Sequence, residues 1–342
     1  MRLRIAAVLQ CATRRTLEDR MAVSTRVDLD RFNALGYLVI EDVLDAAEDI
    51  DPVVAEYEDL LDRLTHRWHA EGKLSDTFIS LPFAKRFARV LQEVRDVNVM
   101  SHFDISLPFR GVTADNPIHL GPAVFRLLTN PRLLDVVEQF VGSEIYSNPI
   151  QHTRIKPPER DVPEALRASS LLAKTDWHQD QGVHLPEADD TDMLTVWLPI
   201  TNATEENGCL CVIPGSHNEG LTIHCPTPGA SIPAELLGGQ PVNLPIRRGG
   251  ALFLNRRTKH ASLTNNSDGI RWSFDLRYHP IGQATGRPRF PGFVARSRAN
   301  PASEIQNPED WADLWRAARV RLAEIEDPGK FTRWTGTEPV CA

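Results

Sequence analysis

The chain has 342 residues, of which 42% are hydrophobic and 25% are charged, and this composition is typical of a folded globular protein rather than a disordered one. The formal net charge of -8 opposes general attraction to nucleic acid or to an anionic membrane surface. No apolar run approaches the length that a membrane-spanning helix needs. The sequence therefore predicts a protein without nucleic-acid or membrane partners, and it leaves the oligomeric state open.

Residues 1–20 have the features of an N-terminal extension. The stretch MRLRIAAVLQCATRR has arginines before and after a short apolar run. This run is too short to be the apolar segment of a signal peptide. We therefore expect residues 1–20 to be an extension, with Met21 as an alternative start of the chain.

The five cysteines, Cys11, Cys209, Cys211, Cys225 and Cys341, do not have the spacing of a zinc ribbon. Cys209 and Cys211 lie two positions apart in a predicted strand, so their side chains point to one face, where we expect buried free thiols. Free thiols favour a reducing compartment, and we therefore predict a cytoplasmic location.

Three segments have the hydrophobic periodicity of amphipathic helices, and each opens with an Asp or Asn cap followed by proline. The segments span residues 51–70, 130–142 and 307–328. Gly142 is expected to end the second helix, and Pro328 limits the third. Their apolar stripes predict that all three pack on a larger core.

Between residues 145 and 280 the sequence changes to short β-branched and aromatic runs separated by Gly, Pro and Asn turns, which predicts antiparallel strands. The candidate strands are EIYSNPIQHTRI, TDWHQD, DMLTVWLPI, GCLCVIP, VNLPI, GALFLN, HASLT and RWSFDLRY. No helical segment lies between them, so a parallel sheet with crossover helices is disfavoured. We predict a mainly β fold with flanking helices and a double-sheet, cupin-like jelly roll as its core.

The predicted elements divide a single structural domain into parts. After the extension, residues 21–144 form a helical part that packs on the β barrel. Residues 145–290 form the barrel itself, and residues 291–342 form a C-terminal helical extension. Prolines gather at residues 157–163 and 226–245, where we expect loops.

The stretch KTDWHQDQG, residues 174–182, holds the strongest candidate for a metal site. In a β-strand, side chains two positions apart project to one face, so His178 and Asp180 can converge on one ion while Gln179 faces away. A third ligand must come from elsewhere, and the best candidate is His260, at the start of a predicted strand. Two histidines and one carboxylate leave open positions on an octahedral metal, which is typical of non-haem Fe(II) oxygenases.

Arg271 is predicted to lie near these ligands. It opens the strand that follows the turn NNSDG, and this hairpin returns it towards the same end of the barrel as His260. Its planar guanidinium can hold a carboxylate through two hydrogen bonds, as the far carboxylate of a metal-chelating 2-oxo acid would require. Polar residues alternate with apolar ones from Arg271 to Arg277, and we favour a barrel interior for the polar face over a solvated surface.

The motifs DWHQD, NGCLCVIPGSH and a distal histidine followed by an arginine occur in this order, and together they resemble the phytanoyl-CoA dioxygenase family of Fe(II)/2-oxoglutarate-dependent oxygenases. The resemblance covers residues 29–280, including the opening DLDRFNALGYLVIEDVL. It implies a double-stranded β-helix in which His178, Asp180 and His260 bind Fe(II) and Arg271 binds 2-oxoglutarate. Ser262 matches a position that helps to bind the same carboxylate.

The resemblance also implies a reaction. Family members couple the oxidative decarboxylation of 2-oxoglutarate by O2, which gives succinate and CO2, to the oxidation of an unactivated C–H bond. Because Asp180 occupies a position that is a small residue in halogenating relatives, we expect hydroxylation of a small organic molecule; desaturation and ring closure need the same ligands and stay open. Gln151 is a further candidate for cofactor binding. Trp197 is a candidate for substrate contact, with a core position as the alternative.

Other interpretations also stay open. His102 and Asp104 form a second histidine–x–aspartate pair that could bind the metal or be structural. A cupin-type isomerase or hydrolase that binds zinc or manganese could use the same three ligands, and a non-catalytic binding protein could keep the barrel. Neither alternative needs Arg271 to bind a co-substrate.

Basic residues before the distal histidine and after the barrel are expected to form solvated faces, or else to attract an anionic substrate such as a CoA thioester. They are Arg256, Arg257, Lys259, Arg287, Arg289, Arg296 and Arg298. Loops at residues 75–120 and 220–245, together with the C-terminal part, are predicted to shape the substrate entrance.

Overall fold

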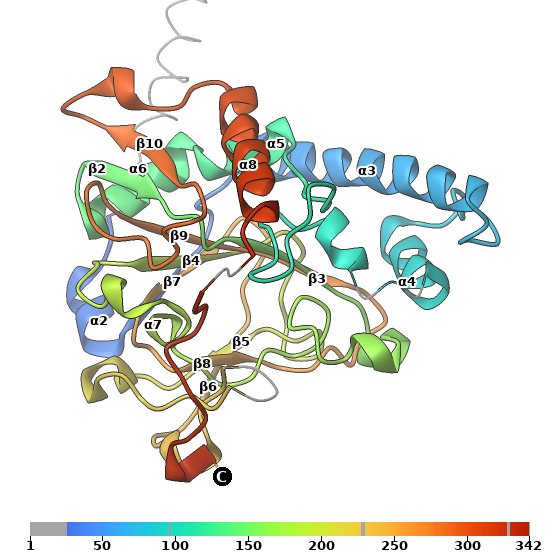
Figure 1. The fold of residues 1–342 in the computed structure, drawn as a ribbon. Coiled ribbons are helices and arrows are strands. Elements are labelled where there is room, and N and C mark those ends of the chain that lie inside the picture. Colours follow the sequence, from blue (N-terminus) through green and yellow to red (C-terminus); the bar gives the residue numbers. More distant parts are fainter. Residues whose placement is uncertain (1–25, 95, 97, 227–229, 327–328, 342) are drawn as a thin grey trace, which may run out of the picture.

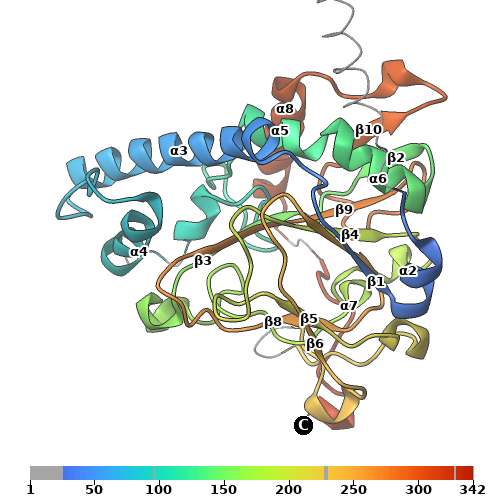
Figure 2. The ribbon, with the colours of Figure 1, turned by 180° about the vertical axis from the view of Figure 1, so that it is seen from behind.

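The computed structural model describes residues 26–94, 96, 98–226, 230–326 and 329–341. The predicted extension, residues 1–20, lies outside these ranges. Helices cover one face of a large antiparallel sheet, and a smaller sheet lies on its other side (Figure 1). Figure 2 shows the same layers from behind. The predicted mainly β fold with flanking helices is confirmed for the described part of the chain.

The large sheet is organised around its longest strand, β9. Its strands are β1 (Tyr37–Ile40), β2 (Glu144–Ser147), β3 (His152–Lys156), β4 (Leu194–Pro199), β7 (Ala251–Asn255), β9 (Arg271–Pro280) and β10 (Phe293–Ser297). Their order is β1-β7-β4-β9-β2-β10, and β3 also pairs with β9. The candidate strand EIYSNPIQHTRI thus forms two strands, β2 and β3, which pair with opposite ends of β9. Strands β1 and β10 were not predicted from the sequence.

The smaller sheet places β5 (Leu210–Val212) between β6 (Val242–Leu244) and β8 (His260–Ser262). Both pairings are antiparallel. All three strands fall within segments that the sequence predicted to be strands. Since β8 begins at His260, this sheet carries the predicted distal metal ligand.

The hydrophobic core has two parts because strands of the large sheet have two buried faces. On β7, Ala251 and Phe253 belong to the cluster that packs against the helices, whereas Leu252 and Leu254 belong to the cluster between the sheets. Alternate residues of a strand point to opposite faces, so a fully buried strand is apolar at every position. Trp197, on β4, also belongs to the cluster between the sheets.

The helices are α2 (Leu29–Leu35), α3 (Asp51–Ala70), α4 (Phe83–Val94), α5 (Pro122–Leu128), α6 (Pro131–Val141), α7 (Asp180–Val183) and α8 (Pro308–Ala323). Shorter helical turns are η1 (Ala46–Ile50), η2 (Val99–His102), η3 (Glu159–Asp161), η4 (Glu164–Leu166), η5 (Pro186–Ala188), η6 (Ser216–Glu219), η7 (Ala234–Leu236), η8 (Pro301–Ser303) and η9 (Pro339–Cys341). The three predicted amphipathic helices are confirmed as α3, α6 and α8. The segment 75–120, predicted as a loop, contains α4; the prediction missed the apolar stripe that α4 buries.

The predicted helix caps are correct at two of three positions. The side chain of Asn130 accepts hydrogen bonds from the amides of Arg132 and Leu133, and Asn307 accepts one from Glu309. Asp51 does not cap α3 but is its first residue. The reason is that the π-helical turn η1 runs directly into α3, so the chain is already helical before Asp51.

Four of the cysteines lie in the described residues, two as free thiols and two in a disulfide. Cys209 and Cys211 are buried free thiols, as predicted. Cys225 and Cys341 form a disulfide that joins residues 116 positions apart. The prediction of a cytoplasmic location assumed free thiols, and this disulfide removes that basis. None of the helices in the described ranges combines the length and the apolar character that crossing a bilayer demands.

Candidate metal centre

Three side chains from distant parts of the chain meet between the two sheets. One ligand atom each from His178, Asp180 and His260 lies within 4.8 Å of the others. The Nε2 atom of His260 is 3.9 Å from Oδ2 of Asp180, and the two imidazole centroids are 4.2 Å apart. Among the described residues this is the one cluster of histidine, cysteine or acidic side chains that could hold a metal ion.

The backbone holds the two histidines together. The amide of His178 donates to the carbonyl of His260 at 3.0 Å, and the amide of His260 donates back at 2.9 Å, which makes an isolated antiparallel bridge. The predicted strand TDWHQD is otherwise wrong, because the chain turns into helix α7 at Asp180. Asp180 therefore joins the histidines through this turn and not through the alternation of a strand.

Hydrogen bonds fix the tautomer of both histidines. Nδ1 of His178 lies 2.8 Å from the carbonyl oxygen of Asp176, and Nδ1 of His260 lies 2.9 Å from that of Thr258. A carbonyl oxygen can only accept, so each Nδ1 carries the proton and each Nε2 presents a lone pair. Burial, and then the neighbouring His260, lower the pKa of His178 to about 3. A neutral His178 at physiological pH is the form that binds a metal.

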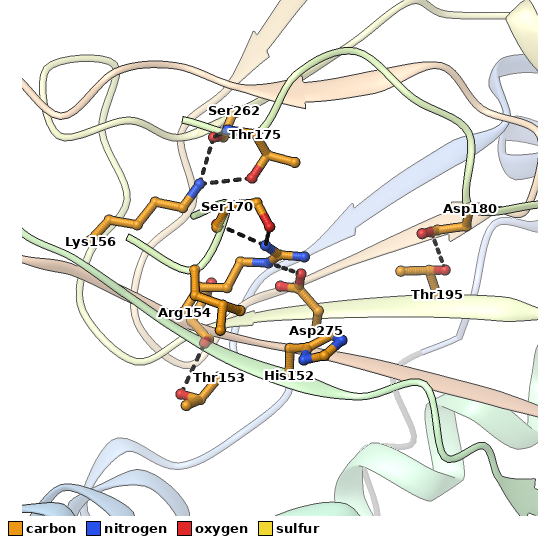
Figure 3. A network of polar contacts seen from close by, with 12 residues as sticks. His152, Thr153, Arg154, Lys156, Ser170, Thr175, Asp180, Thr195, Ser262 and Asp275 are labelled. Atoms are coloured by element: carbon orange, nitrogen blue, oxygen red, sulfur yellow. Dashed lines mark hydrogen bonds and ion pairs between the residues drawn. The ribbon is translucent and has the colours of Figure 1, made fainter. Parts of the chain in front are cut away.

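Two side chains that were not among the predicted site residues hold Asp180. Arg277 forms an ion pair with its Oδ1, and Oγ1 of Thr195 donates to its Oδ2 at 2.5 Å (Figure 3 shows the bond from Thr195). Burial alone would raise the pKa of Asp180, but the Arg277 guanidinium, followed by His260 and His178, lowers it well below its usual value. Asp180 is therefore an oriented carboxylate in its charged form, as a metal ligand must be.

Arg271 is fully buried beside this cluster without a carboxylate partner of its own. Its Nη1 donates to Oγ of Ser273 at 2.7 Å and its Nε to the carbonyl of Gly208 at 3.2 Å, whereas Nη2 has no hydrogen-bond partner. The guanidinium carbon lies 5.5 Å from the ring centroid of Trp197. Asp275, a carboxylate that lines the same cavity, is paired with Arg154. Burial lowers the pKa of Arg271 to about 10, so it stays charged at neutral pH.

A buried lysine, Lys156, lies opposite Arg271 in the pairing of β3 with β9. Its Nζ donates to Oγ1 of Thr175 at 2.8 Å and to Oγ of Ser262 at 2.9 Å (Figure 3). Ser262 also accepts from the amide of Thr175, so its hydroxyl joins the strand β8 to the segment before His178. Burial, and then the charge of Arg271, hold the pKa of Lys156 well below its usual value.

Most of the predicted site residues line one cavity. The three candidate ligands, Arg271 and Trp197 line it together, and so do Asp275 and Arg277, on the strand face that the sequence placed in the interior. The volume of about 20 Å³ suits one water molecule, so a five-carbon dicarboxylate requires neighbouring side chains to shift.

Gln151 and Ser262 do not line this cavity. The amide of Gln151 donates to the carbonyl of Ile105, so its role in cofactor binding stays a prediction. Asp104, from the second histidine–x–aspartate pair, accepts a hydrogen bond from the amide of Thr153 and pairs with His152. The carboxylate of Asp104 therefore binds residues of strand β3.

The chain is similar to known proteins of one family. Residues 32–273 match the family described as "Phytanoyl-CoA dioxygenase (PhyH)". "Phytanoyl-CoA dioxygenase domain-containing protein 1" of Danio rerio is 35% identical over 269 residues, which cover 73% of this chain and 88% of that protein. "Phytanoyl-CoA dioxygenase, peroxisomal" of Homo sapiens is 27% identical over 199 residues, which cover 55% of each chain.

A solved structure described as the non-heme monooxygenase ThoJ in its apo form aligns with a TM-score of 0.54 and 17% identity, covering 86% of this chain and 97% of that one. At this identity the likeness concerns the fold. The family match ends at residue 273, within β9, so β10, α8 and the C-terminal segment lie beyond it.

Proposed function

The chain belongs to the phytanoyl-CoA dioxygenase family of non-haem iron, 2-oxoglutarate-dependent oxygenases, and from this premise we propose that it hydroxylates an unactivated C–H bond of a small organic molecule. The products of the co-substrate would be succinate and CO2. The relatives act on different molecules, so the substrate is a separate question.

The donor atoms fit a ferrous ion. His178 and His260 offer imidazole lone pairs, and Asp180 offers a charged carboxylate whose second oxygen is held by Arg277. Two nitrogens and one oxygen on one face of the ion leave positions for a co-substrate and O2. The carboxylate at Asp180 favours hydroxylation over halogenation, which needs that position open.

The observation that carries the proposal is the buried guanidinium of Arg271, which lies in the same cavity as the ligands, forms no ion pair with the described residues and has an Nη2 without a hydrogen-bond partner. A buried charge without a counter-ion is costly, so such a group marks the place where an anion binds. We assign the far carboxylate of 2-oxoglutarate to Arg271. The amine of Lys156 and the hydroxyl of Ser262 form a hydrogen bond with each other near Arg271.

With O2 as the oxidant, bound iron and 2-oxoglutarate would supply the chemistry that breaks the C–H bond. The residues of the chain would do the rest: Arg277 and Thr195 orient Asp180, and Arg271 orients the co-substrate. The apolar rings and chains of Trp197, Leu210 and Leu254 would exclude water from the cavity that they line.

We also propose that the two sheets form the double-stranded β-helix of this family. The antiparallel pairing of all described strands and the position of the ligands between the sheets support it. The division into a helical part at residues 21–144, a barrel at 145–290 and a C-terminal extension at 291–342 belongs to the same proposal. Strands β1 and β10 lie outside 145–290 but pair with the large sheet.

Succinate release tests this function. The wild-type protein with Fe(II), ascorbate, 2-oxoglutarate and O2 should release succinate slowly without a substrate, and faster when a true substrate is added. Arg271→Gln should lose most of this release at moderate 2-oxoglutarate concentrations.

Arg296→Gln is the matched control, because Arg296 is also buried but is paired with Asp135 and Glu138 away from the cavity. Its succinate release should equal that of the wild type. No succinate from folded, iron-loaded wild-type protein would favour a cupin-type isomerase, a hydrolase or a binding protein instead.

A further inference from the structure

A second and larger cavity lies beside helix α7, on the side of the C-terminal segment. Its volume is about 340 Å³. Apolar Leu185, Phe290 and Phe331 and cationic Arg287, Arg289 and Lys330 are among the residues that line it. This volume is at the lower end of the range for pockets that bind small organic molecules. Most of the lining follows residue 273 and therefore lies beyond the family match.

The charge of this cavity is opposite to that of the whole chain. Its lining holds three cationic side chains and one carboxylate, Glu187, whereas the chain has a formal net charge of -8. A concentration of positive charge on an acidic protein attracts anions to that place.

Arg287 provides the buried anchor of the cavity. It is 4% exposed; its Nη2 donates to the carbonyl of Val183 at 2.6 Å and its Nη1 to that of Gly286 at 3.3 Å. Its Nε is buried without a hydrogen-bond partner. Burial, and then the charge of Arg277, lower the pKa of Arg287 to about 10, so it stays a cation at neutral pH.

One aromatic ring lies against this guanidinium, and two more lie near that ring. The guanidinium carbon lies 4.6 Å from the ring centroid of Phe109. That ring lies 6.1 Å from Phe290 and 6.4 Å from Phe331, measured between centroids. The cavity therefore offers an apolar, partly aromatic wall next to a cation, which suits a molecule with an apolar body and one anionic group.

The cavity is close to the metal centre through α7. Val183, which accepts from Arg287, is the last residue of the helical turn that begins with the candidate ligand Asp180. One turn of helix rises about 5 Å. The next residue, His184, is fully buried, and neither of its ring nitrogens has a partner. Two buried polar groups without hydrogen-bond partners, the Nε of Arg287 and the imidazole of His184, thus lie at the end of the α7 turn.

We propose that this second cavity binds the substrate of the iron centre, and that the substrate is a compact, hydrophobic carboxylic acid whose carboxylate is held by Arg287. The proposal rests on the oxygenase function proposed above. One buried guanidinium whose Nε has no hydrogen-bond partner suits a single anionic group such as a carboxylate. The volume favours a compact acid over a CoA thioester.

Binding of a matched pair of probes tests the proposal. Naphthylacetate and naphthylacetamide have the same size and differ in charge. Their binding to the full chain is measured by calorimetry. Saturating 2-oxoglutarate is present, so that neither probe binds at Arg271. The wild type should bind the acid at least tenfold more tightly than the amide. Arg287→Gln should remove this preference, and Phe331→Ala should weaken both probes equally. Equal affinities in the wild type, or an unchanged preference in Arg287→Gln, would overturn the proposal.

Two further variants separate the effect from loss of folding. Lys330 is exposed, so Lys330→Glu should fold and should weaken the acid severalfold without affecting the amide. Arg296→Gln should keep the wild-type preference, since Arg296 is a buried arginine outside this cavity. An unchanged preference in Lys330→Glu, or a preference lost equally in Arg296→Gln, would count against the cavity.

A spectroscopic measurement tests whether a molecule bound in the second cavity reaches the metal centre. With Co(II) in place of iron, naphthylacetate should alter the visible spectrum of the wild type when 2-oxoglutarate is bound. Tight binding without any spectral change would refute a substrate site. If the protein binds the acid more tightly than the amide but binds neither metal nor 2-oxoglutarate, the proposed oxygenase function is wrong. The second cavity would then be an anion-binding site without a role in an oxygenase reaction.

Discussion

Arg277 and Asp180 form an ion pair in the protein interior, with 6% and 1% of their side-chain surfaces exposed. The same arginine donates to the carbonyl of Ile150 at 2.9 Å, so it links the metal-ligand turn to the start of strand β3. A group that orients a ligand in this way changes metal affinity without touching the metal.

Replacing Arg277 should therefore weaken metal binding. We expect Arg277→Met to lower the affinity for Fe(II) or Co(II) by about 10- to 100-fold, the usual effect of losing a group that holds a ligand. Without metal, the unpaired Asp180 should also cost about 3–5 kcal/mol of unfolding free energy. Metal titration followed by urea denaturation measures both. Arg296→Met should lose stability but keep its metal affinity; unchanged affinity in Arg277→Met would refute the role.

Arg271 should control the affinity for 2-oxoglutarate. Arg271→Gln removes a charge-assisted hydrogen bond, which is worth about 1.5–3 kcal/mol and corresponds to a roughly 10- to 150-fold higher KM for the co-substrate. Arg271→Lys should recover part of the loss, because it keeps the charge but not the planar fork. The affinity for the metal alone should not change in either variant. A normal KM in Arg271→Gln would place the co-substrate elsewhere.

The carboxylate of Glu56 should make a pH-dependent contribution to the free energy of unfolding. It pairs with His119 at 2.9 Å and accepts from the amides of Ala123 and Val124 at the start of α5. Burial opposes ionisation, but the bond from His119 and the amides lower the pKa of Glu56 below its usual 4.5. A lowered folded-state pKa stabilises the fold above the unfolded pKa, and this stability is lost as the pH falls through the folded value.

Glu56→Gln should therefore cost about 1–2 kcal/mol of unfolding free energy at neutral pH. The difference from the wild type should shrink as the pH drops below about 4, the range in which an unfolded glutamate takes up its proton. Urea denaturation at several pH values measures it. Glu58→Gln, at an exposed position of the same helix, should show no such difference. If the difference in unfolding free energy between the wild type and Glu56→Gln stayed constant across pH, the ionised carboxylate would not be its cause.

The disulfide between Cys225 and Cys341 should stabilise the C-terminal segment. Cys341→Ser should lower the unfolding free energy by about 2–5 kcal/mol, because the bond closes a loop of 116 residues. A reductant should lower the Tm of the wild type and leave that of the variant unchanged. Equal Tm values with and without reductant in the wild type would show that the bond contributes nothing.

The sequence predicted those parts of the structure that depend on local pattern. The stripes of α3, α6 and α8 and the alternation along β9 are visible in the order of residues, and the structure confirms them. The motif order also indicated the three candidate ligands, which the fold brings together. The reason for their convergence was only partly right, because Asp180 begins a helical turn and not the next position of a strand.

The support around the ligands could not be predicted in the same way. Lys156 is followed by two prolines and looks like the end of a strand, and nothing local indicates that its amine meets Ser262, 106 positions later. Arg277 looked like one more polar residue of β9. The pairing of Cys225 with Cys341 likewise depends on the path of the C-terminal segment, which passes α7 on its way to the smaller sheet (Figure 1).

The most direct test of the iron and 2-oxoglutarate assignment is an anaerobic titration followed by visible absorption. Adding Fe(II) and then 2-oxoglutarate to the wild-type protein should produce the weak charge-transfer band of a chelated 2-oxo acid, and His178→Ala should abolish it. Arg271→Gln should require a much higher 2-oxoglutarate concentration to reach the same band. No band from folded wild-type protein, or an unchanged band in His178→Ala, would contradict the assignment.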